Sequence, residues 1–132
     1  MVGNKNMVET GVMIFGYAGM IQIFWVYGAP IYEDRKEVWE MLKRKVVRCE
    51  GLIMCVGDFN DVISEMEKKG GRRKEKKKIE CFQEMINSCG LNDAHYKGQK
   101  FTWYGIREGE LIKERLDKAL VNLEWMEAFS NM

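Results

Sequence analysis

The chain has 132 residues, a length that suits one domain with a hydrophobic core but not two. Its hydrophobic content of 46% and charged content of 31% are those of a globular protein and exclude an intrinsically disordered chain. The net charge of +1 gives the whole molecule no strong attraction to nucleic acid. The charge is unevenly distributed, because eight of the 21 basic residues lie between Lys68 and Lys78.

The cysteine pattern excludes two common kinds of site. Cys49, Cys55, Cys81 and Cys89 form no Cys-x-x-Cys pair, and the chain contains a single histidine, His95. A zinc site needs ligands at closer spacing, and a disulfide framework needs a secretory context. We therefore expect reduced thiols in an intracellular protein.

An apolar segment at residues 11–30 admits two interpretations. Its only strongly polar side chain is Gln22, and its length approaches that of a membrane-spanning helix. Three glycines interrupt it, however, and its aromatic and β-branched residues favour strands. The sequence therefore predicts a hairpin of strands 12–15 and 21–27 with a turn at 16–19, and membrane association through this segment stays as an alternative. No A-x-A-like cleavage site follows, which disfavours a signal peptide.

The apolar pattern after residue 30 predicts a helix and then a strand. One helical face carries Val38, Met41, Leu42 and Val46, with Trp39 beside them. Acidic residues precede this face and basic residues follow it, which suits the helix dipole. The apolar run at 52–56, between two glycines, predicts a buried strand. Strand, helix and strand form a crossover unit, so we expect an α/β fold.

The rest of the chain predicts further elements of the same domain. The basic segment 68–78 is expected to form a loop, and a helix ending near Gly90 carries Ile79, Phe82, Met85 and Ile86 on one face. We then expect a turn at 97–99, strands at 101–104 and 116–121, and a short helix at 123–129. No repeat or linker divides residues 1–132, which we treat as a single domain.

The most informative motif is Gly57-Asp58-Phe59-Asn60, directly after the strand 52–56. In open α/β sheets, ligands bind outside the carboxyl ends of strands. Asp58 could orient a water molecule, protonate a leaving oxygen or hold Mg²⁺, and the Asn60 amide could donate to a phosphate oxygen. A turn capped by the two side chains explains the same residues equally well.

Two further residues in strand-like segments have a functional and a structural interpretation. Asp117 falls within an apolar strand, where a carboxylate needs a partner, and Arg115 lies two residues away on the same face. A surface ion pair is the structural alternative. Trp103, in the aromatic strand, could stack on nucleic acid, but such a strand more often packs in a core.

Motifs along residues 24–129 resemble, in order and spacing, those of the endonuclease/exonuclease/phosphatase superfamily. The version fused to plant non-LTR retrotransposon reverse transcriptases is the most similar. The motifs are Val26-Tyr27-Gly28-x-Pro30, Arg35, Trp39, Gly57-Asp58-Phe59-Asn60, Glu67-Lys68-x-Gly70-Gly71, Cys89-Gly90-Leu91-x-Asp93, Gly98-x-x-Phe101-Thr102-Trp103 and Glu114-Arg115-Leu116-Asp117-x-Ala119-Leu120-Val121-Asn122.

The resemblance implies a partial four-layer α/β sandwich with a mixed sheet and flanking helices. It implies a Mg²⁺-dependent phosphodiesterase that nicks DNA to prime reverse transcription, with Mg²⁺ neutralising charge on the leaving oxygen. Asp58 would generate or position the nucleophile, and Asn60 would contact the scissile phosphate. Tyr27 would lie near that phosphate, and Asp117 would orient a catalytic histidine.

Several parts of the superfamily's active site have no match here. No motif before Val26 matches the superfamily's Asn and metal-binding Glu, and its Ser-Asp-His motif would come after Met132. His95 lies in the wrong place to replace that histidine. We therefore expect a domain truncated at both ends, with an incomplete Mg²⁺ site at Asp58 and little or no nuclease activity alone. Loss of half a sandwich should also expose apolar sheet surface and promote self-association.

A nucleic-acid-binding remnant without catalysis is the main alternative function. It would use the basic segment and two residues of the later motifs; the candidates are Arg72, Arg73, Lys74, Trp103 and Arg115. The basic run is also consistent with a solvated loop or with a nuclear localisation signal.

Overall fold

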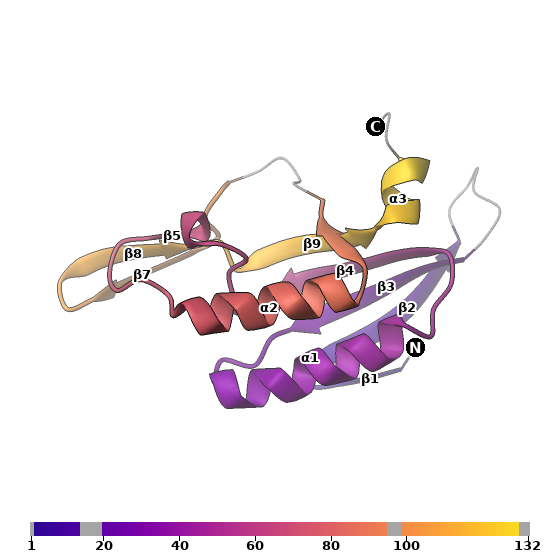
Figure 1. Ribbon diagram of the computed structural model, residues 1–132, viewed down its shortest axis with the longest axis horizontal. Coiled ribbons are helices and arrows are strands. Elements are labelled where there is room, and N and C mark those ends of the chain that lie inside the picture. The colour runs from indigo at the N-terminus through magenta and orange to yellow at the C-terminus, as the bar shows by residue number, and fades with distance from the viewer. Residues whose placement is uncertain (1, 14–19, 95–98, 130–132) are drawn as a thin grey trace.

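The computed structural model describes residues 2–13, 20–94 and 99–129, which form a mixed sheet, a smaller sheet and three helices (Figure 1). The strands are β1 (Val2–Asn4), β2 (Met7–Met13), β3 (Met20–Tyr27), β4 (Leu52–Asp58), β5 (Lys68–Lys69), β6 (Leu91–Asp93), β7 (Trp103–Arg107), β8 (Glu110–Glu114) and β9 (Asp117–Asn122). The helices are α1 (Tyr32–Val46), α2 (Lys76–Ser88) and α3 (Leu123–Ala128), with a short 3₁₀ helix at Glu65–Glu67. The large sheet has the order β1-β2-β3-β4-β9-β6, and the small sheet has the order β5-β8-β7.

The predicted crossover unit is present. β3 and β4 are parallel neighbours, α1 connects them, and the other strand pairs of the large sheet are antiparallel. Glu33 and Asp34 lie in the first turn of α1 and basic residues in its last turn, as the helix dipole favours. The fold class is therefore α/β with a mixed sheet and flanking helices, as expected.

The apolar segment forms a hairpin rather than a helix. β2 and β3 pair antiparallel, although the first strand spans Met7–Met13 instead of 12–15. The predicted turn at 16–19 lies outside the described residues. No helix in the described part of the chain is both long enough and apolar enough to span a membrane.

The basic segment does not form one loop, which corrects the prediction. Its first two lysines form β5, which pairs with β8, and its last three form the first turn of α2. The strand expected at 101–104 begins instead at Trp103, and the neighbouring β8 was not predicted. The cause is long-range pairing, which local apolar alternation does not reveal.

The core lies between the large sheet and the two long helices, which cover one face of it (Figure 1). Phe24, Cys55 and Leu120 point from neighbouring strands into this core and are fully buried. Three aromatic rings, Trp39, Phe59 and Phe82, pack together with centroids 5.1 to 5.9 Å apart. All four cysteines are free thiols, and Cys55 is the one that is completely buried.

The opposite face of the large sheet is partly open. Side chains alternate between the two faces of a strand. Phe24 and Val26 therefore face the helices, while Trp25 and Tyr27 point the other way and are 50% and 47% exposed. We call this surface the open face.

Candidate active site

Three of the four predicted catalytic residues lie on adjacent central strands, at one end of the large sheet. Tyr27 ends β3, Asp58 ends β4, and Asp117 begins the antiparallel β9. The register pairs Tyr27 with Asp58 and Asp58 with Asp117. Directly opposed antiparallel residues have Cα atoms about 4.5–5.5 Å apart, so the two carboxylates are close neighbours.

The three side chains share the face that the helices leave open. Phe24, Cys55 and Leu120 occupy the helix face of the same three strands. By alternation, Tyr27, Asp58 and Asp117 project from the other face. A ligand can therefore approach these three side chains without displacing α1 or α2.

Two glycines allow the ends of β3 and β4 to approach closely. The Gly28 amide donates to the Asp58 carbonyl at 2.7 Å. A Cβ atom at Gly28 would lie 2.1 Å from the Phe59 carbonyl oxygen, and one at Gly57 would lie 2.1 Å from the Val26 carbonyl oxygen. Gly57 also has a φ of +144°, which side chains strongly disfavour. The glycines of the two motifs are thus required by backbone contact at the site.

Asn60 closes the turn that follows Asp58. Its backbone amide donates to Asp58 Oδ1 at 2.8 Å, and its side-chain Nδ2 donates to the Gly28 carbonyl. Asn60 itself adopts a left-handed φ of 52°. The capped turn predicted as an alternative is therefore present. It holds Asp58 and Asn60 together at the end of β4.

Partial burial raises the pKa of the Asp58 carboxyl group, and the neighbouring carboxylate of Asp117 raises it further. The hydrogen bond from the Asn60 amide and the charges of Lys118 and Arg35 oppose this shift. A carboxylate with increased proton affinity is better suited to accept a proton from water, as a general base does.

Thr102 fixes the position of Asp117, a role that the sequence analysis did not assign. Its Oγ1 accepts hydrogen bonds from the backbone amides of Leu116 at 3.1 Å and Asp117 at 3.0 Å. The Phe59 amide donates to the Leu116 carbonyl at 2.9 Å. In the sequence, this role was indicated only by the position of Thr102, a polar residue between two aromatic ones.

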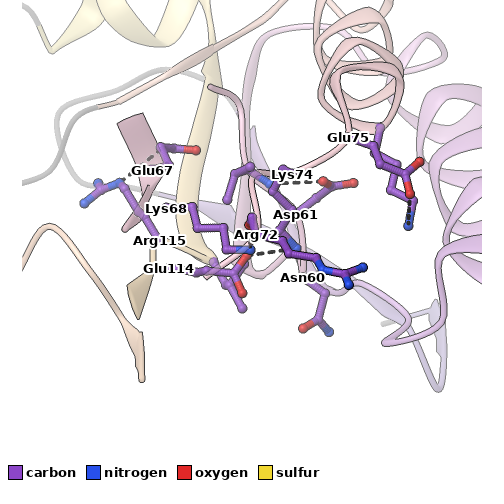
Figure 2. A network of polar contacts seen from close by, with 12 residues as sticks. Asn60, Asp61, Glu67, Lys68, Arg72, Lys74, Glu75, Glu114 and Arg115 are labelled. Carbon is purple, nitrogen blue, oxygen red and sulfur yellow. Dashed lines mark hydrogen bonds and ion pairs between the residues drawn. The ribbon is translucent and has the colours of Figure 1, made fainter. Parts of the chain in front are cut away.

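A buried ionic cluster joins the loop after β4 to the start of β9. Lys118, with a fully buried side chain, lies 3.0 Å from Glu67 Oε1. Arg115 Nε lies 3.6 Å from Glu67 Oε2 (Figure 2). Lys118 Nζ also donates to the carbonyls of Asp61 and Arg115. Burial lowers the pKa of Lys118, while Glu67 opposes this. The cluster was not predicted, although a lysine within an apolar strand was a usable signal.

A second buried ion pair supports the same loop. Arg35 Nη1 lies 3.3 Å from Asp61 Oδ2, and both side chains are nearly inaccessible. The same guanidinium donates to the carbonyls of Ala29 at 2.8 Å and Pro30 at 2.9 Å. Arg35 therefore links the ends of β3 and β4 from the helix side.

The predicted nucleic-acid residues are divided between surface and interior. Arg72 and Arg73 are exposed, and Lys74 is paired with Glu114 at 2.9 Å. Trp103 is partly buried against a small cluster that includes Leu116. The structure thus brings the two arginines, but not Trp103, to an open surface.

Arg115, the last of these candidates, is engaged inside the protein. Besides Glu67, its guanidinium donates to the carbonyls of Gln99 at 3.3 Å and Lys100 at 3.2 Å. Its side chain therefore holds a neighbouring segment in place.

A complete metal site does not occur in the described part of the chain. Nowhere there do three or more Asp, Glu, His or Cys side chains gather in a way that could hold a cation. Asp58 and Asp117 face each other and supply two carboxylates, fewer ligands than an independent site needs. The described residues therefore do not fit a Mg²⁺ ion by themselves.

Comparison with known proteins identifies the architecture. No model of a known protein family matches the sequence, and no curated protein matches it. Among solved structures, the chain is similar to the endonuclease domain of TRAS1, a telomere-specific non-LTR retrotransposon, with a TM-score of 0.64 and 19% identity. The match covers 92% of this chain and 52% of that domain. The chain therefore shares the fold of the matched part of this endonuclease domain.

Two further structures support this architecture. The 3′ phosphatase NExo from Neisseria, solved with a product DNA hairpin, matches with a TM-score of 0.57 and 17% identity, covering 87% of this chain and 52% of that one. A beta toxin from Staphylococcus aureus matches with a TM-score of 0.50 and 18% identity, covering 92% and 44%. The chain thus spans about half the length of the structures it matches, and these likenesses establish its fold.

Proposed function

We propose that this chain is part of a DNA endonuclease domain of the type fused to plant non-LTR retrotransposon reverse transcriptases. The supporting observation is the register that aligns Tyr27, Asp58 and Asp117 on three adjacent strands. The resemblance assigned catalytic roles to these residues from three separate motifs. Three separate motifs that place their residues side by side at one end of the sheet are better explained by a shared site than by three unrelated turns.

The geometry suggests a role for each residue. Asp58, whose pKa is raised, accepts the proton of the attacking water, and Asp117 beside it tunes that proton affinity. Asn60 fixes the loop through its bond to Gly28 and presents its amide at the phosphate. The Tyr27 side chain, 47% exposed at the end of β3, borders the same position.

We further propose that nuclease activity depends on Mg²⁺ and is weak or absent in this chain alone. Asp58 and Asp117 supply only two carboxylates, so water, substrate phosphate or other protein groups would have to provide most of the Mg²⁺ ligands. A plasmid-nicking assay with Mg²⁺ tests both points. We expect any nicking to stay near background, to stop when Mg²⁺ is chelated and to be lost in Asp58→Ala, with Asp34→Ala, which removes an exposed carboxylate of α1, as the matched control. Nicking that persists without Mg²⁺ would contradict the metal dependence, and vigorous nicking would contradict the weak activity. Nicking unaffected by Asp58→Ala would contradict the role of Asp58.

Nucleic-acid binding without catalysis is the second candidate function. The exposure of Arg72 and Arg73 favours it, because neither has an ion-pair partner among the described residues. Binding should weaken steeply with salt. This function would place the protein inside the cell, in the nucleus if the basic segment is also a localisation signal.

We also propose that the open face drives self-association. Trp25 and Tyr27 leave about half of their surface in solvent on this face, and exposed apolar patches favour association. Light scattering should show species larger than a monomer, and Trp25→Lys should reduce them. A monodisperse monomer at high concentration would contradict this proposal.

A further inference from the structure

A cavity lies between residues 68–72, which include β5 and the turn after it, and the β7–β8 hairpin, away from Asp58. Its volume is about 500 Å³, and Lys68, Arg72 and Arg107 line it together with two glutamates. A second cavity of about 240 Å³ adjoins it and shares the walls formed by Lys68, Gly71 and Arg72. We call the larger cavity the hairpin pocket.

The wall of the hairpin pocket is held in place by its own hydrogen bonds. Lys68 Nζ donates to the Arg72 carbonyl (Figure 2). The Gly71 amide donates to Glu110 Oε2 at 2.6 Å. Gly70 has a φ of +87°, and a Cβ there would lie 2.2 Å from the Leu111 carbonyl oxygen. The loop is therefore shaped before any ligand binds, which reduces the entropic cost of binding.

The charges of the pocket favour an anion with a single negative charge. Lys68, Arg72 and Arg107 contribute three positive charges, and Glu108 and Glu110 contribute two negative ones, so the lining carries a net charge of +1. Arg72 and Arg107 are exposed and form no ion pair within the described residues. Glu110 is already engaged with the Gly71 amide. Two arginine forks thus remain available for a phosphate group.

Burial lowers the pKa of Lys68, and the nearby charges of Lys74 and Arg107 lower it further, while Glu114 opposes them. Crowding of positive charge at this position is relieved when an anion binds between the cations. Lys74 differs, because its ion pair with Glu114 at 2.9 Å satisfies its charge.

We propose that the hairpin pocket binds a phosphodiester group of the nucleic-acid backbone through Lys68, Arg72 and Arg107. This rests on the proposed function, in that nucleic acid is the ligand. A backbone phosphodiester carries one negative charge, which matches the lining better than the dianion of free phosphate. The small sheet extends beyond the same end of the large sheet at which β3 and β4 end (Figure 1). A nucleic-acid strand bound beside Asp58 can therefore continue toward the hairpin pocket.

Salt titration of DNA binding tests this proposal. The affinity of the whole chain for a short labelled DNA duplex is measured by fluorescence anisotropy over a range of salt concentrations. Each lost phosphate contact reduces the slope of log K against log salt by about 0.9. We expect Arg72→Gln combined with Arg107→Gln to lower the slope and to weaken binding at low salt. Lys74→Gln should have a smaller effect.

The matched control replaces two exposed arginines, Arg44→Gln in the last turn of α1 and Arg48→Gln just after the helix. These residues precede β4 and so lie at the opposite end of the large sheet, and we expect them to leave the slope unchanged. An equal loss in the control and pocket variants would overturn the proposal, because it would indicate a general charge effect. An unchanged slope in the pocket variant would overturn it directly.

Two further arms separate the alternatives. Inorganic phosphate at constant ionic strength should not displace the duplex; displacement would show a free-phosphate site instead. If the pocket variant loses the slope while nicking does not depend on Asp58, the pocket stands and the proposed catalytic function fails. The reverse pattern would retain the function and refute the pocket.

Discussion

Neutralising Glu67 should be among the most destabilising single changes in this protein. Its carboxylate contacts Lys118 at 3.0 Å and Arg115 at 3.6 Å, and accepts the Ile63 amide at 2.6 Å. The side chains of the two cations are 0% and 11% exposed. Glu67→Gln keeps the shape and one hydrogen-bond acceptor but removes the carboxylate charge that contacts both buried cations.

The expected magnitude follows from this burial. Breaking a buried ion pair by removing one partner costs about 3–5 kcal/mol, because the remaining charge is desolvated and unpaired. A domain of this size unfolds with a total free energy of about 5–15 kcal/mol. Glu67→Gln should therefore remove a large fraction of the stability. Lys118→Met should cost less, since Glu67 would keep Arg115 and the Ile63 amide as partners.

Urea unfolding followed by circular dichroism measures these differences. The midpoint should fall without a change in m-value, which indicates an effect on the folded state. Glu80→Gln is the matched control, because its ion pair with Lys76 at 3.8 Å is exposed and should contribute less than about 1 kcal/mol. The double variant Glu67→Gln with Lys118→Met should be more stable than the sum of the single effects predicts.

A loss below about 1 kcal/mol for Glu67→Gln, equal to that of the control, would refute this reasoning. It would mean that water reaches the cluster and solvates Lys118. Additive effects in the double variant would likewise show that the two side chains are not energetically coupled.

Three other changes test the site geometry. Asp58→Asn should stabilise the protein by less than about 1 kcal/mol near neutral pH. The raised pKa means that ionised Asp58 beside Asp117 is unfavourable, so the gain should disappear as pH falls below the unfolded pKa; a gain that persists in acid would contradict it. Gly28→Ala should cost about 1–3 kcal/mol or prevent folding, because its Cβ would lie 2.1 Å from the Phe59 carbonyl; an unchanged urea midpoint would be incompatible with that contact. Thr102→Val removes the acceptor of two backbone amides at the start of β9 and should cost about 1–3 kcal/mol in the same assay, so a neutral result would exclude this role.

Local sequence patterns were sufficient for the central unit of the fold. The apolar run ending at Val56, the change to helical spacing after Pro30 and the glycines that bound the strand predicted β3, α1 and β4. These signals are local, because each depends on which side chains can cover one face of a single element. The same signals placed Asp58 at the end of a strand.

Long-range pairing decided the elements that the sequence did not reveal. β8 has no clear apolar alternation, and it exists because it pairs with β5 and β7. β6 is three residues long and is defined by its pairing with β9. Their stability comes from partners far along the chain, so no short window contains the information.

The sequence by itself determined which residue types stand at the ends of the strands and that a cluster of positive charge follows them. The tertiary structure alone decided how those groups are used. The register set Asp58 opposite Asp117, burial turned Arg115 and Lys118 inward to Glu67, and folding of the small sheet left Arg72 exposed beside Arg107. The physical reason is that the cost or benefit of a charge depends on its burial and its partners, and both arise from contacts between distant segments.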